Sequence, residues 1–213
     1  MLFLYYSPGA SSLAPHIVLE EIGEPYETVL ARVDIRSVEE NITDPEYLKI
    51  NAKGRVPALQ VDGRTLTEAP AILSFLGCRH PEAQLMPVSS EGAARCHEWM
   101  AWLSTTVHAV ALGQIVRPQR FVADVKDFPA VIGKGRDNLD AAFTHIEREL
   151  HGREWATGGA YTIVDPYLLF YYFVGGWLQL PMKTRYPAWA RVMERTMARP
   201  AVRRVLGKEG LRP

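Results

Sequence analysis

Two adjacent serines near the start of the chain have a type and position that could support chemistry. Ser11 and Ser12 follow an apolar run and a Pro-Gly pair, and an apolar helical pattern begins directly after them. The first N–H groups of a helix lack partners inside it, and the helix dipole makes this end positive. One interpretation makes both serines plain helix caps, with Ser12 as the N-cap and Pro15 at the third helical position. The other makes this helix end a site that holds a thiolate or a carboxylate.

A valine–proline pair before a predicted strand could present backbone groups to a ligand. Pro57 lacks a donor for the strand ladder, so it belongs at an edge or in a special turn. Val56 is biased towards extended geometry by the proline that follows it. Its N–H and C=O are then either free to pair with an extended ligand or part of a rigid turn.

Glu68 lies in the stretch TEAPAIL, where a predicted strand ends and a predicted helix begins. Its carboxylate could receive an ammonium, while the N–H groups at the start of the helix could receive a carboxylate. Together these groups would suit the zwitterion of an amino acid. The alternative is an acid in the first helical turn that complements the helix dipole.

His108 and the stretch YTIVDPYL lie in helical patterns further along the chain. His108 is part of an apolar pattern, WMAWLSTTVHAVAL, where the spacing alone favours a hydrogen-bonded core histidine over a catalytic one. Thr162 and Asp165 have the spacing of a capping box, with Asp in place of the longer Glu. We interpret this second stretch as structural and assign it no chemistry.

The sequence predicts two kinds of structure around these candidates. The order in the first 80 residues is β-α-β-α-β-β-α, which indicates a mixed sheet with helices on its faces. The predicted elements are strands at 2–6 and 26–34, helices at 12–23 and 44–50, a hairpin with Asp62-Gly63 as its turn, and a helix at 67–78. Long helical patterns then cover 91–116, 129–150, 162–178 and 188–197. We therefore expect an α/β domain at 1–80, a linker at 81–89 and an all-helical domain at 90–213.

Composition disfavours several classes of function. The chain contains 24 Lys and Arg and 24 Asp and Glu, so no net charge attracts nucleic acid or an anionic membrane. Cys78 and Cys96 have no zinc-site spacing and are expected to be reduced in the cytosol, so we expect a cytoplasmic protein without a metal. The start of the chain has no signal-peptide pattern. Residues 166–182 carry no charge but are too few to span a bilayer, which predicts a buried helix.

Four stretches resemble the cytosolic glutathione transferases, and the bacterial beta class most closely: YYSPGASSLAPHIVLEE, NAKGRVPAL, TEAPAIL and YTIVDPYL. The resemblance covers nearly the whole chain. It implies an α/β thioredoxin-like N-terminal domain with a cis proline, here Pro57, and an all-α C-terminal domain. It also implies a homodimer that binds glutathione near the subunit interface, where Thr105 and Thr106 would approach the partner's ligand.

The resemblance also implies roles for individual residues. Val56 would pair with the cysteinyl backbone of glutathione, while Glu68 and the backbone N–H of Ala69 would hold its γ-glutamyl end. His108 resembles a histidine that approaches the thiol in beta-class proteins. Two positions depart from the family pattern, because Ser11 stands where beta-class proteins usually have cysteine and Ala69 where many members have serine. The hydroxyl missing at Ala69 would weaken glutathione binding by about 1.5–3 kcal/mol, the value of a hydrogen bond to a charged group.

A serine cannot form a mixed disulfide, but it can donate a hydrogen bond to a bound thiolate and lower the pKa of that thiol. Ser11, assisted by His108, is therefore the candidate activator of glutathione. The predicted function is conjugation of glutathione to electrophilic small molecules, a detoxification reaction. The alternative is a non-catalytic ligand-binding or protein-interaction module on the same fold.

Two further expectations concern the reaction. A glutathione-dependent reductase is disfavoured because Cys78 and Cys96 lie outside the four stretches. The electrophile would lie against the helices. The residues that are equally possible as its lining or as core are Trp102, Val107, Ala111 and Phe121.

Overall fold

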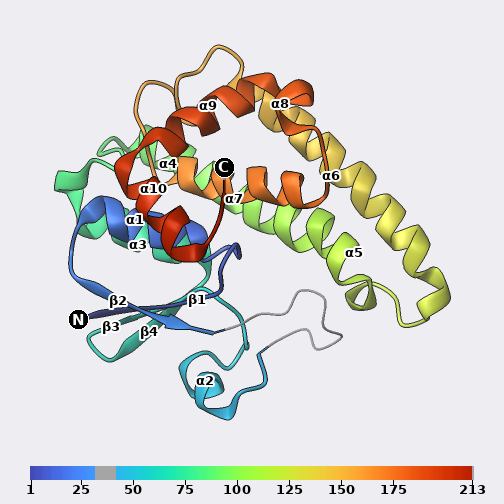
Figure 1. Ribbon diagram of the computed structural model, residues 1–213, viewed down its shortest axis with the longest axis horizontal. Helices are drawn as coiled ribbons and strands as arrows, with labels where there is room; N and C mark the ends of the chain where they lie inside the picture. Colours follow the sequence, from blue (N-terminus) through green and yellow to red (C-terminus); the bar gives the residue numbers. More distant parts are fainter. Residues whose placement is uncertain (32–41, 213) are drawn as a thin grey trace.

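A computed structural model describes residues 1–31 and 42–212 of the chain. Its first part is a four-stranded mixed sheet in the order β2-β1-β3-β4 (Figure 1). The strands are β1 (Leu2–Tyr6), β2 (Tyr26–Leu30), β3 (Ala58–Val61) and β4 (Arg64–Thr67). β1 pairs with β2 in parallel and with β3 antiparallel. β3 and β4 form the predicted hairpin, in which Asp62 and Gly63 both have positive φ, as a tight two-residue turn requires.

Three helices accompany the sheet: α1 (Leu13–Ile22), α2 (Pro45–Ile50) and α3 (Ala69–Arg79). In Figure 1, α1 and α3 lie between the sheet and the rest of the molecule, and α2 lies on the other side of the strands. α1 ends as predicted at Gly23, whose left-handed backbone lets its N–H bond the Leu19 carbonyl. The predicted element order is confirmed. β2 ends at Leu30, and residues 32–34 of the strand predicted at 26–34 lie outside the described residues.

The remainder of the described chain is largely helical. Its α-helices are α4 (Ser90–Trp102), α5 (Gly113–Val116), α6 (Phe128–Leu150), α7 (Val164–Trp177), α8 (Met182–Arg185), α9 (Pro187–Ala198) and α10 (Pro200–Glu209). Short 3₁₀ turns are η1 (Pro81–Ala83), η3 (Pro118–Arg120) and η4 (Val125–Asp127). The four predicted helical patterns are confirmed, whereas α10 was not predicted.

The predicted helix at 91–116 is continuous but changes its winding. Between α4 and α5 the segment η2 (Leu103–Leu112) is π-helical, and the Gly113 N–H bonds the His108 carbonyl five residues before it. Wide turns of this kind occur frequently at functional sites. His108 therefore lies in a distorted part of the helix, which spacing in the sequence did not indicate.

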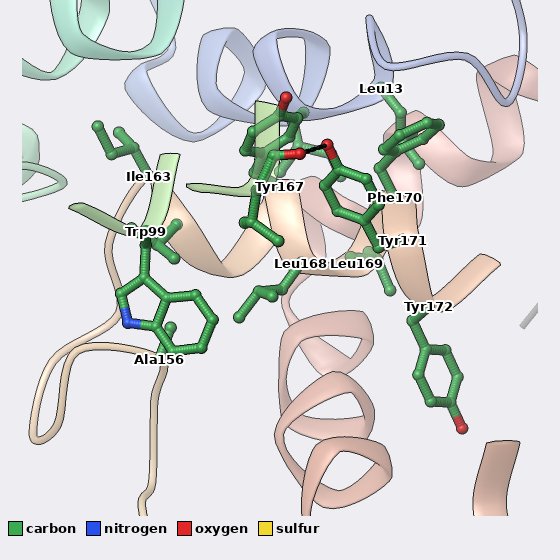
Figure 2. Packing of buried hydrophobic residues seen from close by; sticks show 14 of the residues in the cluster. Leu13, Trp99, Ala156, Ile163, Tyr167, Leu168, Leu169, Phe170, Tyr171 and Tyr172 are labelled. Atoms are coloured by element: carbon green, nitrogen blue, oxygen red, sulfur yellow. Dashed lines mark hydrogen bonds between the residues drawn. The ribbon is translucent and has the colours of Figure 1, made fainter. Parts of the chain in front are cut away.

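α7 occupies the centre of the hydrophobic core, as the uncharged stretch at 166–182 predicts. Figure 2 shows its side chains, among them Tyr167 and Tyr171, packed with Leu13 of α1 and Trp99 of α4. The burial ends with the helix, since Gly176 and Trp177 are exposed, Trp177 by 46%. α1 thus contacts both the sheet and the helical part, so the residues just before α1 lie where the two parts meet. Within the described ranges, no helix is both long and apolar enough to cross a membrane.

The capping box predicted at the start of α7 is present in part: Asp165 makes its bond back to the Thr162 N–H, but the N-cap residue is Ile163 and not Thr162. The Asp165 carboxylate accepts hydrogen bonds from the Thr162 N–H and from the Ala156 N–H, each at 2.8 Å. Burial raises the pKa of Asp165 to about 6, although the bonds from these N–H groups work in the opposite direction. The structural interpretation of this motif agrees with its geometry.

Candidate active site

A small polar pocket of about 90 Å³ lies where the sheet part meets the helical part. Six of the eight predicted site residues line it: Ser11, Val56, Pro57, Glu68, Ala69 and His108. The remaining two, Thr105 and Thr106, are exposed on η2 and are not part of its lining. Their predicted role concerns a ligand in a partner subunit and stays a prediction.

Ser11 belongs to the loop between β1 and α1, directly before the N-cap residue of α1. Its hydroxyl donates to the Val56 carbonyl at 3.4 Å, which is long for a bond of this type. Such a weak bond leaves the hydroxyl able to turn towards a ligand. The interpretation of both serines as plain caps is wrong, because Ser12 makes no side-chain cap bond. Its hydroxyl instead bonds both the N–H and the C=O of Ser7, at 3.2 and 3.1 Å.

The Val56-Pro57 peptide bond is cis, as the resemblance implied. The residue before it, Arg55, is held through its carbonyl, which accepts from the Tyr47 hydroxyl at 2.7 Å and from the Asn51 side-chain amide at 2.6 Å. α2 and the residue that follows it therefore fix the segment that leads into the pocket. Their bonds place the Val56 carbonyl next to Ser11.

Glu68 lies between β4 and α3 with a positive φ of 72°. This conformation is uncommon for a residue with a side chain and is often found at functional sites. The Glu68 carboxylate pairs with the Lys53 ammonium, which also donates to the Thr67 hydroxyl at 2.8 Å. Ala69 follows as the first residue of α3, where helix N–H groups lack partners inside the helix. A carboxylate, an ammonium and a helix start thus lie together on one wall of the pocket.

His108 also lines the pocket and contacts the rings of Phe170 and Tyr171, at 5.8 and 6.3 Å between centroids. Its Nδ1 is buried and has no hydrogen-bond partner among the described residues. Burial lowers the pKa of His108 to about 4, and the charges of Arg55 and Arg120 act in the same direction. The imidazole is therefore neutral near pH 7. The neutral ring can donate a hydrogen bond to a ligand or accept one from it, but it carries no positive charge.

The chain is similar to known proteins over nearly its whole length. Residues 2–77 match the family model described as "Glutathione S-transferase, N-terminal domain". Over 211 residues the chain is 31% identical to the glutathione S-transferase GstA of Escherichia coli O157:H7, which covers 98% of this chain and 99% of that protein. The chain belongs to the glutathione S-transferase family.

Solved structures of this family extend the likeness to the whole fold. A glutathione transferase homologue from Sulfitobacter with bound glutathione has a TM-score of 0.86 and 32% identity, covering 98% of each chain. A bacterial beta-class glutathione S-transferase from Sphingomonas chungbukensis has a TM-score of 0.81 and 31% identity, covering 99% of this chain and 100% of its own. The predicted combination of a thioredoxin-like N-terminal fold and a helical C-terminal part is confirmed.

Several lining residues of the pocket were missed by the sequence analysis: Asn51, Lys53, Arg55, Pro70, Ser104 and Tyr167. The first three lie in NAKGRVPAL, which was used only as a family signature. Ser104 precedes His108 by four residues, a spacing that places both on one side of a helix and could have indicated it. Tyr167 belongs to YTIVDPYL, so assigning no chemistry to that stretch overlooked a residue that faces the pocket.

None of the four residues considered as lining for the electrophile lines the small polar pocket. Val107 and Ala111 are buried in the core, and Trp102 packs against His145. A larger apolar hollow of about 540 Å³ lies instead between α7, α8 and the end of the chain. Its lining includes Tyr172, Phe173, Trp177, Leu180 and Met182.

The two cysteines are unpaired and lie away from the polar pocket. Cys78 is exposed, while Cys96 is buried with its pKa raised to about 11 by burial. A thiol with such a pKa is inert near neutral pH. Among the described residues, no group of three or more His, Cys, Asp or Glu side chains is arranged to hold a metal ion.

Proposed function

We propose that this family member conjugates glutathione to electrophilic small molecules and that Ser11 stabilises the attacking thiolate. The observation that carries the proposal is the convergence of Ser11, the Val56 carbonyl and the Glu68–Lys53 pair on one pocket. These groups match the three polar parts of a γ-glutamyl-cysteinyl peptide, namely a thiol, a backbone amide and a zwitterion. Relatives of known structure, such as the Sulfitobacter homologue, contain bound glutathione.

In this proposal the zwitterionic γ-glutamyl end lies at Glu68, Lys53 and the first N–H groups of α3. The cysteinyl N–H pairs with the Val56 carbonyl, which the Ser11 hydroxyl then releases. That hydroxyl becomes free to donate to the sulfur, where it favours the thiolate over the thiol. The thiol proton passes to solvent, and the thiolate then forms the C–S bond with the electrophile, which either expels a leaving group or takes up a proton from solvent at the other atom of its double bond. Ser11 keeps its proton throughout.

His108 has a supporting role in this proposal. Because its imidazole is neutral near pH 7, it offers the ligand an N–H or an acceptor nitrogen but no charge. The neutral imidazole donates from only one of its two ring nitrogens, whereas the Ser11 hydroxyl can always rotate to donate, and the positive end of α1 lies beside it. The larger part of the thiolate stabilisation is therefore assigned to Ser11 and the start of α1.

A conjugation assay with a generic chlorinated nitroaromatic electrophile tests the function directly. We expect turnover that depends on glutathione and saturates with it. Glutathione binding by calorimetry without any turnover across a panel of electrophiles would instead favour the non-catalytic module.

Replacing Glu68 with glutamine should weaken glutathione binding by about 1.5–3 kcal/mol, because a charged hydrogen bond to the ammonium is lost. The side chain keeps its size, and it is 63% exposed, so the fold should not change. Calorimetry on the parent and the variant measures the difference. The matched control is Glu46→Gln, which removes an exposed acid that pairs with Lys49 outside the pocket. Equal affinities in the parent and Glu68→Gln would remove Glu68 from the site.

We further propose a homodimer in which the face of η2 that bears Thr105 meets its partner. Residues 99–116 contain no Asp, Glu, Lys or Arg, yet Thr105, Thr106 and Val110 are exposed. An uncharged exposed helical face of this kind is typical of an interface. Light scattering at micromolar concentration should give twice the chain mass, whereas the mass of a single chain would contradict the proposal.

A further inference from the structure

A buried carboxylate at the far end of the sequence contacts the loop that carries Ser11. Glu209 is the last residue of α10, and its Oε2 accepts from the Gly9 N–H at 2.9 Å. Its Oε1 is 2.7 Å from the Nδ1 of His16, which lies in α1. The side chains of His16 and Glu209 are at most 1% exposed. One carboxylate thus connects the loop, the helix that follows it and the last helix.

The loop between β1 and α1 is bonded to itself at several points. The Ser12 hydroxyl bonds both backbone groups of Ser7, and the Ala10 N–H bonds the Ser7 carbonyl at 3.1 Å. Gly9 lies at the outer turn of this loop with a φ of 70°. Its N–H is bonded from outside the loop, by Glu209. The loop is therefore bonded internally, and its outer end is held by α10.

Two surface ion pairs between α10 and α1 are of a different kind. Arg204 and Lys208 pair with Glu20 at 2.6 and 2.8 Å, and both cations are about half exposed. These pairs join the two helices at the surface, where such interactions contribute little. The Glu209 carboxylate is buried, and the hydrogen bonds it accepts are charge-assisted. Such bonds are strong, and leaving a buried group without them is costly.

We propose that Glu209 is a positioning residue for the thiolate site, which it supports by fixing Gly9 so that the Ser11 hydroxyl faces the pocket. This inference rests on the proposed role of Ser11. The distance from Gly9 to Ser11 along the chain is only two residues, so a loosened outer turn changes where that hydroxyl points. His16 holds the carboxylate in place from the side of α1.

Three variants test this proposal. Glu209→Leu keeps the bulk of the side chain and removes both acceptor atoms, whereas Glu209→Gln keeps a neutral acceptor. Lys208→Leu is the matched control, because it breaks a surface pair of the same helix without touching the loop. Amide hydrogen exchange of Gly9 by NMR, without any ligand, measures how firmly the loop is held.

We expect exchange of the Gly9 amide roughly tenfold faster or more in Glu209→Leu, from the loss of a charged hydrogen bond. Glu209→Gln should show a smaller increase, and Lys208→Leu should match the parent. If Glu209→Leu does not fold, the exchange rate of the Gly9 amide in Glu209→Gln decides the outcome. Parent-like exchange in the folded Glu209 variants, or equal acceleration in Lys208→Leu, would overturn the proposal.

The second measurement is the pKa of the thiol of glutathione when it is bound to each variant. A lowered thiol pKa in the parent that rises in Glu209→Leu, partly recovers in Glu209→Gln and is unchanged in Lys208→Leu supports positioning. A faster Gly9 exchange with an unchanged bound-thiol pKa would overturn it, because the contact would then be only structural. A parent without a lowered thiol pKa would instead refute the role of Ser11, and the exchange data would still report on the contact itself.

Discussion

Replacing Ser11 with alanine should slow conjugation near neutral pH by roughly 10- to 100-fold, the equivalent of one hydrogen bond to a charged group. The hydroxyl is the donor that this account assigns to the thiolate, and alanine removes it without adding bulk. Affinity for glutathione should change little, because Glu68, Lys53 and Val56 hold the rest of the peptide. Steady-state kinetics with calorimetry separate the two effects.

His108→Ala is the control that shows how much of the rate enhancement comes from His108 and how much from Ser11. Its imidazole lines the same pocket and is neutral near pH 7, so only one of its two ring nitrogens can donate, whereas the Ser11 hydroxyl can always rotate to donate. We expect a smaller loss of rate in His108→Ala than in Ser11→Ala. The reverse order would assign the activation of the thiol to η2 and not to the loop before α1.

Replacing Asp165 with alanine should have the largest effect on stability, a loss of about 2–6 kcal/mol in the free energy of unfolding. The variant leaves the N–H groups of Thr162 and Ala156 buried without their acceptor, at about 1–3 kcal/mol each. Urea unfolding measures the change. Glu149→Ala, which breaks an exposed pair with Arg153, is the matched control and should cost less than about 1 kcal/mol. Similar losses in both variants would contradict the role of Asp165.

The pH dependence of stability provides a second signature of Asp165. Its pKa is raised from 3.8 to about 6 in the folded protein, so folding takes up a proton between these values. The contribution of this group to stability is therefore complete below the lower value and is lost as the pH rises through 6. Relative to Asp165→Asn, the parent should gain about 1 kcal/mol between pH 7 and pH 5. A constant difference between the two proteins over this range would contradict the raised pKa.

Local patterns predicted most of the fold because its elements carry their own signals. The Asp62-Gly63 turn, the glycine after α1 and the four long helical patterns are all set by residues close in sequence. α10 has such signals too, with Pro200 at its start and Gly210 after its end, and they could have been recognised. The π-helical winding of η2 could not, because no local signal in its residues marks it.

The candidate site was predicted in part, and the missing parts are those that need distant residues. Ser11, Val56 and Glu68 have local features that indicated them, and they line one pocket. The bonds of Glu209 to Gly9 and His16 join residues 200 and 193 positions apart. His16 stands within an apolar helical stripe, where nothing nearby distinguishes it. Such pairs become visible only when the fold places α10 beside α1.

An ultraviolet titration of thiolate absorbance in the glutathione complex measures the pKa of the bound thiol. A free cysteine thiol ionises near 8.5, and each unit of depression equals about 1.4 kcal/mol of preference for the thiolate. We expect a bound-thiol pKa at least about one unit below that value in the parent, returning towards it in Ser11→Ala. A bound thiol that titrates in the parent as it does in free glutathione would contradict activation of the thiol by this site.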